Sequence, residues 1–221
     1  MDKIVFKDGT FKLSTKIIGI GLNYTEHIEE MHSQKTGDPV IFLKPPSALC
    51  DMSKPIRILT DYGAVHHEIE LAVCISKKGS NIAEKDAYHF VAGYGLILDL
   101  TLRDLQMEYK KAGLPWAVAK GFDNSCPVST FVPAKQISNP HNLNLRLTIN
   151  NQLKQNGHTS QMIYRIPELI AYISKFFTLM EGDLILTGTP AGVGPIVPGD
   201  KIHAEIDQIA AIDTVIISGG N

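Results

Sequence analysis

The sequence predicts an α+β protein that is mainly β. Short segments with strand periodicity run from one end of the chain to the other, and a few helical segments stand among them without regular alternation. A doubly wound α/β protein would instead alternate strands and helices in a regular order. Neither an internal repeat nor a Pro/Gly/Ser-rich linker divides the chain, so we expect one domain over residues 1–221.

The first segments are two short strands with a helical turn between them. Residues 16–21 and 40–43 are apolar enough for buried strands, and two prolines stop the second one. Thr25 is suited to cap a helical turn that runs through Met31.

The side chains of residues 65–75 alternate between two faces with the period of a single strand. His66, Glu68 and Glu70 share a face that ends in Ala72 and Cys74. Because this face changes from acidic to small and apolar, we expect the strand to be buried on both sides at its far end. The acids would then lie at the mouth of a cavity.

Residues 91–100 are almost continuously apolar and predict a central strand that ends in Asp99. The pattern Thr101-x-x-Asp104 predicts a cap for a helix that ends near Gly113.

Residues 143–149 alternate again, and Asn150-Asn151 predicts a hairpin turn. Residues 163–180 show helical periodicity, with Pro167 in the first turn and Gly182 at the end. The chain closes with three predicted strands: 184–187, 201–206 and 211–217.

Composition narrows the class of function. The chain has 221 residues, 44% of them hydrophobic and 20% charged, and a formal net charge of −2. This balance is typical of a globular protein and offers no basic field for nucleic acid. The apolar runs are too short to span a bilayer, and three scattered cysteines fit reduced thiols in the cytoplasm.

Glu68 and Glu70 are candidate metal ligands, because carboxylates two residues apart on a strand point the same way, roughly 7 Å apart at their roots. Two buried anions repel each other, and a hard cation such as Mg²⁺, Mn²⁺ or Ca²⁺ would remove that repulsion. A solvated strand face would show the same pattern. Asp99 could complete a three-carboxylate site or cap the following helix.

Other candidates are weaker when taken alone. His27 and Glu30 meet at i, i+3 on a helical turn, where the carboxylate could orient the imidazole as a base, although most such neighbours do nothing. Lys120 and Lys44 either extend to solvent or face an anionic ligand. The glycine-rich run 187–194 could be a plain connection or a turn that binds a carboxylate through its backbone and Thr189.

Taken together and in chain order, these segments resemble the motifs of the fumarylacetoacetate hydrolase family, in particular its short acylpyruvase and oxaloacetate-handling branch. The resemblance covers about residues 16–206. The matching residues are Gly21-Leu22-Asn23-Tyr24 with His27 and Glu30, Phe42-Leu43-Lys44-Pro45, His66-His67-Glu68-Ile69-Glu70, Asp99-Leu100-Thr101 with Arg103-Asp104, Ala119-Lys120 with Phe122-Asp123, and Thr187-Gly188-Thr189-Pro190 with Gly192-Val193-Gly194.

The resemblance implies a mixed β-roll fold, a homodimer and a short 2-oxo acid as substrate. It implies that Glu68, Glu70 and Asp99 bind Mg²⁺ or Mn²⁺. It further implies that His27 and Glu30 lie on a lid and, with Lys120, are catalytic, and that the substrate is bound by Gln106, Gly188 and Thr189. Members of the branch often carry Arg where this chain has Leu22, which leaves the reaction open.

Three reactions share one enolate that the metal would stabilise: hydrolysis of an acylpyruvate, decarboxylation of oxaloacetate, and its keto–enol tautomerisation. An isomerase or decarboxylase of unsaturated 2-oxo dioic acids is one alternative, which a pocket basic enough for a second, distant carboxylate would favour. A family member that has lost activity is the other.

Overall fold

A central sheet and a curled second sheet form the body of the protein. The computed structural model describes residues 3–30 and 37–219, except for the side chains of residues 27–29. The central sheet has the order β4-β3-β15-β8-β9-β11-β5, and β12 pairs with β9. Its strands are β3 (Ile17–Gly21), β4 (Val40–Lys44), β5 (Leu49–Asp51), β8 (Ile69–Ile75), β9 (Val91–Leu98), β11 (Cys126–Val128), β12 (Val132–Pro133) and β15 (Leu184–Leu186).

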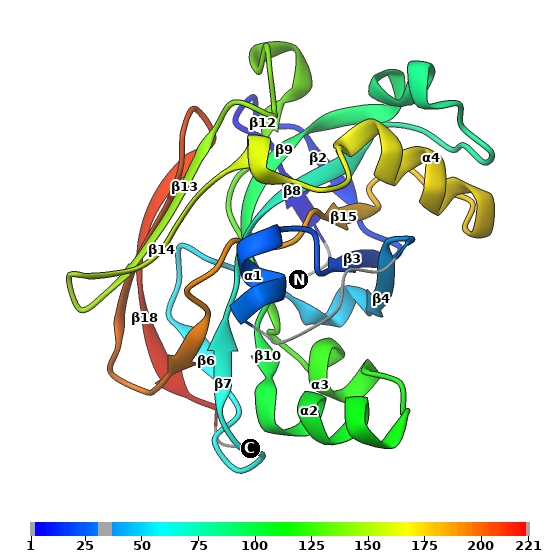
Figure 1. The fold of residues 1–221 in the computed structure, drawn as a ribbon. Helices are drawn as coiled ribbons and strands as arrows, with labels where there is room; N and C mark the ends of the chain where they lie inside the picture. The colour runs from blue at the N-terminus through cyan, green and yellow to red at the C-terminus, as the bar shows by residue number, and fades with distance from the viewer. Residues whose placement is uncertain (1–2, 31–36, 220–221) are drawn as a thin grey trace.

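The second sheet has the order β14-β13-β17-β18-β6 and curves along one side of the molecule (Figure 1). The remaining strands form two smaller sheets with the orders β1-β2 and β10-β7-β16. The strands of these three sheets are β1 (Lys3–Val5), β2 (Phe11–Leu13), β6 (Ile56–Ile58), β7 (Val65–His67), β10 (Thr101–Leu102), β13 (Asn144–Ile149), β14 (Gln152–His158), β16 (Gly194–Ile196), β17 (Lys201–Ile206) and β18 (Ala210–Ser218).

Helices lie around the sheets rather than between successive strands (Figure 1). The mainly β, α+β class is therefore confirmed. The α-helices are α1 (Thr25–Glu30), α2 (Arg103–Ala112), α3 (Ala117–Gly121) and α4 (Ile166–Phe176); the 3₁₀ turns are η1 (Pro46–Ala48), η2 (Glu84–Phe90), η3 (Ala134–Gln136) and η4 (Thr159–Gln161).

The core occupies both faces of the central sheet. Strand β8 is buried along its whole length, as its composition predicts. Leu71 and Val73 belong to the larger apolar cluster, which also holds buried residues of α4 and the curled sheet. Ala72 and Cys74 belong to the smaller cluster on the opposite face. Strand β8, in the middle of the sheet, is thus covered on both faces.

Two helix predictions need correction. Thr101 does not cap α2: it lies in β10, and its hydroxyl donates to the carbonyl of Asp99. The helix predicted over 163–180 extends only from Ile166 to Phe176, because Leu179 forms backbone hydrogen bonds with Gly79 instead of continuing the helix. Gly182 accordingly does not end the helix but lies in the turn that leads into β15.

Three other predictions at element ends are confirmed. Pro167 lies in the first turn of α4, and Gly113 ends α2 in the left-handed region with φ of 67°. Asn150 and Asn151, with φ of 51° and 64°, connect β13 and β14 as a tight hairpin turn. The end predicted at Met31 lies outside the described residues.

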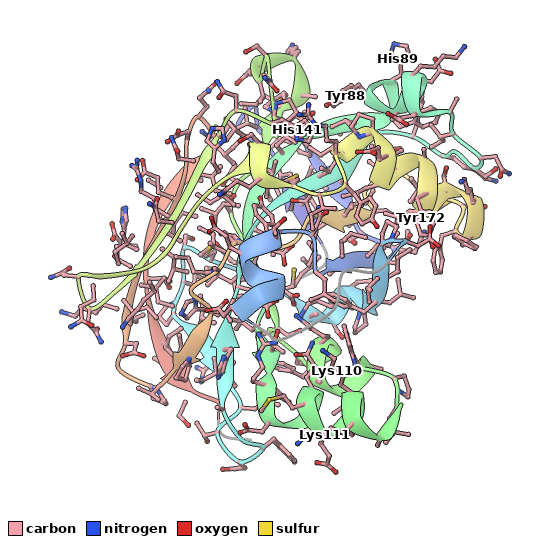
Figure 2. All side chains as sticks on the ribbon, in the orientation of Figure 1. Tyr88, His89, Lys110, Lys111, His141 and Tyr172 are labelled. Carbon is pink, nitrogen blue, oxygen red and sulfur yellow. The ribbon has the colours of Figure 1, made fainter. Side chains whose placement is uncertain are left out.

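His141 provides a pH-dependent contact at the start of α4 (labelled in Figure 2). Its buried Nε2 accepts a hydrogen bond from the backbone of Ile166 at 3.3 Å. Burial lowers the pKa of His141, and the charge of Arg165 lowers it further, whereas a hydrogen bond with the Thr159 backbone and the charge of Glu168 oppose the shift.

Only a neutral ring can accept that bond, so its contribution is present above the ordinary histidine pKa and is lost as pH falls through the lowered value. We expect the free energy of unfolding to drop by about 1 kcal/mol more in the wild type than in His141→Gln between about pH 7 and about pH 5. Urea unfolding of both proteins across this range measures the difference. Equal slopes for the two proteins would contradict the assignment.

Candidate active site

The site forms where two neighbouring segments of the chain pass from one sheet to another. Glu68 lies between β7 and β8, and Asp99 follows β9 just before β10. The backbone N–H of Asp99 donates to the carbonyl of Glu68 at 2.8 Å. The strand predicted over 65–75 is therefore two strands in different sheets, and it breaks at the residue that carries the first carboxylate.

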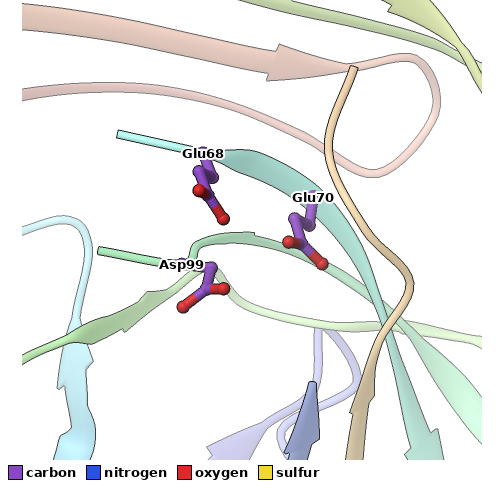
Figure 3. A group of neighbouring side chains, drawn as sticks. All are labelled: Glu68, Glu70 and Asp99. Atoms are coloured by element: carbon purple, nitrogen blue, oxygen red, sulfur yellow. The ribbon is translucent and has the colours of Figure 1, made fainter. Parts of the chain in front are cut away.

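Glu68, Glu70 and Asp99 form a compact cluster of carboxylates (Figure 3). One oxygen from each lies within 4.8 Å of the others, and all three residues are buried. Burial, followed by the charges of Asp99 and Glu68, raises the pKa of Glu70 well above its usual value. The cluster therefore strongly favours a cation.

Three cationic side chains contact the cluster: Lys120, Arg103 and Lys44. The Lys120 ammonium donates to Glu68 at 2.8 Å and to Asp99 at 2.6 Å. Burial alone would lower the pKa of Lys120, but the charges of Asp99 and Glu68 raise it, so the side chain is cationic at neutral pH. Arg103 pairs with Glu68 and donates to Gln106 at 2.6 Å.

Lys44 holds Asp99 of the cluster and the neighbouring backbone in place. Its side chain is completely buried and pairs with Asp99 at 2.7 Å. It also donates to the Ser125 carbonyl at 2.9 Å and to the carbonyls of Leu100 and Lys120. Of the two sequence interpretations of Lys44, the structure excludes extension to solvent: the residue fixes one carboxylate and the backbone that carries Lys120.

The cluster lies on a cavity of about 420 Å³. The lining is acidic and cationic at the cluster and apolar along much of the wall. The lining residues are Ile20, Gly21, Leu22, Phe42, Glu68, Glu70, Arg103, Gln106, Met107, Lys110, Lys111, Trp116, Lys120 and Thr189. Six of the sequence-predicted site residues meet at this one cavity: Glu68, Glu70, Gln106, Lys120 and Thr189 directly, and Asp99 through its contact with Lys120.

Gly19 is required for the apolar wall. A Cβ at this position would lie 2.1 Å from the Phe42 ring, so only glycine lets the ring lie against β3. The Lys120 ammonium lies 4.8 Å from the centre of the same ring. The sequence Ile17–Gly21 thus positions an aromatic surface beside a catalytic candidate.

The glycine-rich run 187–194 binds carboxylates of this chain. The N–H of Gly188 donates to Glu70 at 2.6 Å, and the N–H of Gly192 donates to Glu30 at 3.0 Å. The Thr189 hydroxyl donates to the carbonyl of Ile69 and accepts from Gln155, both at 2.8 Å. Substrate binding by Gly188 and Thr189 therefore stays a prediction, and their present contacts position Glu70 and the cavity wall.

Helix α1 is docked over this run. Asn23, just before it, is buried and donates to the carbonyls of Thr187 and Tyr164 at 2.8 and 3.1 Å. Glu30, at its other end, accepts from Gly192. The side chain of His27 lies outside the described part of the structure, so the predicted His27–Glu30 dyad stays a prediction.

Sequence reasoning missed the roles of two residues that shape the site. Arg103 stands in a family-like motif, but its pairing with Glu68 needs the fold. Gln155 is buried at 0% exposure and connects His67, Ile69 and the glycine-rich run. The sequence gives no signal for it, because a glutamine among the polar residues of β14 does not stand out, and only the fold shows that Gln155 and Gly157 are buried.

Comparison with known families agrees with this geometry. The family model described as fumarylacetoacetate (FAA) hydrolase, C-terminal, matches residues 16–217. The chain belongs to the fumarylacetoacetate hydrolase family. Oxaloacetate tautomerase YcgM of Escherichia coli is 50% identical over 194 residues, which cover 87% of this chain and 89% of that protein.

Two further relatives show the range of the family. The mitochondrial oxaloacetate tautomerase FAHD1 of Mus musculus is 50% identical over 196 residues, 89% of each chain. The fumarylpyruvate hydrolase of Pseudomonas aeruginosa, solved with Mn²⁺ and pyruvate, is 30% identical with a TM-score of 0.94, over 98% of this chain and 96% of that one. Family membership and the fold implied by the resemblance are thus confirmed.

The residues present fit a hard divalent cation. The cluster offers oxygen ligands only, which suit Mg²⁺ or Mn²⁺ better than zinc. Burial and two neighbouring carboxylates disfavour the charged form of Glu70, and a bound cation would stabilise that form. Glu68, Glu70 and Asp99 would hold such an ion.

Proposed function

We propose that the protein is a divalent-metal-dependent enzyme that interconverts the keto and enol forms of oxaloacetate. The observation that carries the proposal is the buried cluster Glu68, Glu70 and Asp99 beside the Lys120 ammonium in a single cavity. The identity of 50% to two oxaloacetate tautomerases supports this substrate. Mg²⁺ or Mn²⁺, when bound, would polarise the 2-oxo group as a Lewis acid.

Side chains of the protein itself would transfer the proton and stabilise the negative charge that develops on the substrate. Enolisation removes a proton from C3 and leaves negative charge on the C2 oxygen. Lys120, which is kept cationic by its carboxylate neighbours, would face that oxygen. His27, oriented by Glu30, would accept the C3 proton, and the Lys120 ammonium would donate a proton to the C2 oxygen to complete the enol. Proton exchange with solvent would then restore both side chains. The apolar wall around Phe42 and Trp116 would exclude water and so disfavour hydrolytic side reactions.

NMR with purified protein tests the reaction. The protein is mixed with Mg²⁺ and either oxaloacetate or acetylpyruvate, with EDTA controls. We expect faster keto–enol exchange of oxaloacetate, dependent on metal. Pyruvate and CO₂ from oxaloacetate would instead indicate a decarboxylase. No change in either substrate would contradict the proposal and favour a dioic-acid isomerase or an inactive member.

Hydrolysis of an acylpyruvate is a second candidate, favoured by the similarity to a fumarylpyruvate hydrolase structure. That reaction needs a water activated at the 4-carbonyl, and the dyad would supply the base. Acetate and pyruvate from acetylpyruvate would identify it.

Variants of the dyad test its role as the base, which both reactions would require. We expect His27→Ala to lose hydrolysis by about 10²–10⁴-fold, the usual contribution of a general base. Glu30→Gln removes the charge but keeps an oxygen for the Gly192 N–H, so it tests orientation without undocking α1. NMR rates on both substrates measure the effects. Normal hydrolysis by His27→Ala would exclude its role as the base.

The assembly and location of the protein also stay proposals. We propose one catalytic domain over residues 1–221 that forms a cytoplasmic homodimer. Leu43, Leu114 and Val118 are 43–55% exposed and line two adjoining grooves beside the edge strand β4, which supports a dimer. Within the described residues, every helix is too short or too polar to cross a bilayer.

A further inference from the structure

The backbone between Glu68 and Glu70 passes the end of a neighbouring strand. The N–H of Asp99 donates to the Glu68 carbonyl, so the segment bonds to its β9 neighbour at Glu68 and turns the backbone groups of Ile69 to the other side. On that side β15 pairs with β8 over residues 72–74 and stops short of Ile69. The N–H and C=O of Ile69 therefore need partners from elsewhere in the fold.

Two side chains take the place of a strand at Ile69. Its N–H donates to Gln155 Oε1 at 3.0 Å, and its C=O accepts from the Thr189 hydroxyl at 2.8 Å. Gln155 Nε2 in turn donates to the Thr189 hydroxyl at 2.8 Å and to the Pro190 carbonyl at 2.9 Å. Because a backbone N–H lies at one end of the Gln155 amide and a backbone C=O at the other, the orientation of the amide is fixed. The contacts close a ring of hydrogen bonds around Ile69.

This ring holds the two peptide groups that join the acids. The N–H of Ile69 belongs to the peptide group that follows Glu68, and its C=O belongs to the one that precedes Glu70. Both carboxylates point from this segment toward Asp99 (Figure 3). The position of the Ile69 backbone therefore sets how far apart the Glu68 and Glu70 carboxylates lie.

Strand β14 is shaped to bring Gln155 to this place. It is an edge strand whose first three residues are exposed, yet Gln155 is buried. The register with β13 shifts between Leu147 and Thr148, so that Leu147 lies opposite Gln155 instead of Lys154. Leu147 is a buried residue of the core. The bulge thus turns the glutamine inward where an unbroken register would place the lysine.

Two glycines let β14 approach the glycine-rich run closely. A Cβ at Gly157 would lie 2.4 Å from the Pro190 side chain, and one at Gly192 would lie 2.0 Å from the Lys154 carbonyl. A larger residue at either position would push the strand and the run apart. The bulge and both glycines therefore serve the same contact, in which Gln155 reaches the run and Ile69 together.

We propose that Gln155 is a positioning residue that fixes the spacing of the Glu68 and Glu70 carboxylates and so adapts the cluster to a small divalent cation. The inference rests on the proposed function, in which these carboxylates bind Mg²⁺ or Mn²⁺. Gln155 acts through the peptide groups of Ile69 and does not itself bind the ion. Mg²⁺ requires nearly ideal octahedral geometry, whereas Ca²⁺ accepts longer and less regular sets of oxygen ligands. Loosening this backbone should therefore weaken Mg²⁺ binding more than Ca²⁺ binding.

Gln155→Met tests the proposal, because methionine has a similar length but makes none of these hydrogen bonds. We expect the affinity of the metal-stripped protein for Mg²⁺ to fall by about 10–100-fold, the usual effect of losing a residue that orients metal ligands. The affinity for Ca²⁺ should change less. Calorimetry measures the binding of Mn²⁺ and its displacement by Mg²⁺ or Ca²⁺. Gln152→Met, an exposed change on the same strand, is the control and keeps both affinities.

Thr189 provides a second test from the other side of Ile69. Thr189→Val removes the hydroxyl with little change of shape and should lower the ratio of Mg²⁺ to Ca²⁺ affinity as Gln155→Met does. Thr189→Ser keeps the hydroxyl and should keep the ratio. Thr159→Val removes another buried hydroxyl, which accepts from the Leu143 N–H at 3.0 Å. It is the control for a general loss of stability and should also keep the ratio.

The outcomes separate this inference from the proposed function. An unchanged ratio in both Gln155→Met and Thr189→Val, or an equal fall in Thr159→Val, overturns the inference even if the wild type enolises oxaloacetate. A lowered ratio in both variants supports it even if the wild type binds Mg²⁺ without turning over oxaloacetate, which would contradict the proposed function alone. A wild type that binds none of the three ions would overturn both.

Discussion

Replacing Glu70 with glutamine is expected to abolish metal binding while leaving the metal-free protein at least as stable as the wild type. Glu70 is buried, and its pKa is raised by burial and by two neighbouring carboxylates. Its side chain accepts a hydrogen bond from the Gly188 N–H at 2.6 Å. A glutamine oxygen can accept that bond without carrying a desolvated charge. The substitution therefore removes a proposed metal ligand and relieves a repulsion between carboxylates at the same time.

Asp99 belongs to the same cluster but should respond in the opposite way. It is the partner of Lys44 and Lys120, so Asp99→Asn leaves two buried cations short of a counter-charge. We expect about 3–5 kcal/mol of destabilisation. In EDTA, chemical unfolding should show Glu70→Gln near or above the wild type and Asp99→Asn well below it.

If the cluster binds metal as proposed, calorimetry with Mn²⁺ should show that both variants lose metal affinity by more than about a hundredfold, since each would lack one of the proposed ligands. Glu84→Gln, an exposed change on η2, serves as the control and keeps both properties. Equal stability losses in Glu70→Gln and Asp99→Asn would contradict this account of the cluster.

Replacing Lys44 with methionine is expected to cost about 3–5 kcal/mol of folding free energy. Methionine has nearly the same length, so the change removes the charge and the donors rather than volume. It leaves Asp99 without one of its two cations. It also leaves the carbonyls of Leu100, Lys120 and Ser125 without this donor. Activity should fall as well, because the same contacts position Asp99 and the backbone of Lys120.

The same substitution at an exposed ion pair provides the control. Lys54 lies 3.7 Å from Asp51, and its side chain is 71% exposed, so Lys54→Met should change stability by less than about 1 kcal/mol. A double-mutant cycle of Lys44→Met with Asp99→Asn measures the coupling between the buried charges. A loss in Lys44→Met no larger than in Lys54→Met would show that Lys44 does not anchor the cluster.

The sequence predicted much of the fold because local signals agreed with it. Pro167 and Gly113 marked helix ends, Asn150-Asn151 marked a hairpin, and alternation marked the strands. Predictions failed where tertiary contacts compete with local preference. Thr101 has a capping side chain, yet pairing between β10 and β7 holds it in a strand.

The candidate metal ligands were visible in the sequence for a related reason. Acids in segments that are otherwise apolar are costly to bury, so Glu68, Glu70 and Asp99 stand out from their neighbours by residue type alone. The same argument was ambiguous for lysines, because a long side chain can reach solvent from an apolar segment. Only the fold showed that Lys44 is enclosed whereas Lys110 and Lys111 line the cavity.

The sequence by itself determined the class of fold, the family and the acids able to bind a cation, because these depend on periodicity and residue type. The tertiary structure decided how they act together. It placed Glu68 and Asp99 side by side where two chain segments change sheets, and it set Lys120 between them. Such contacts join residues far apart in the chain, so their geometry exists only once the sheets have paired.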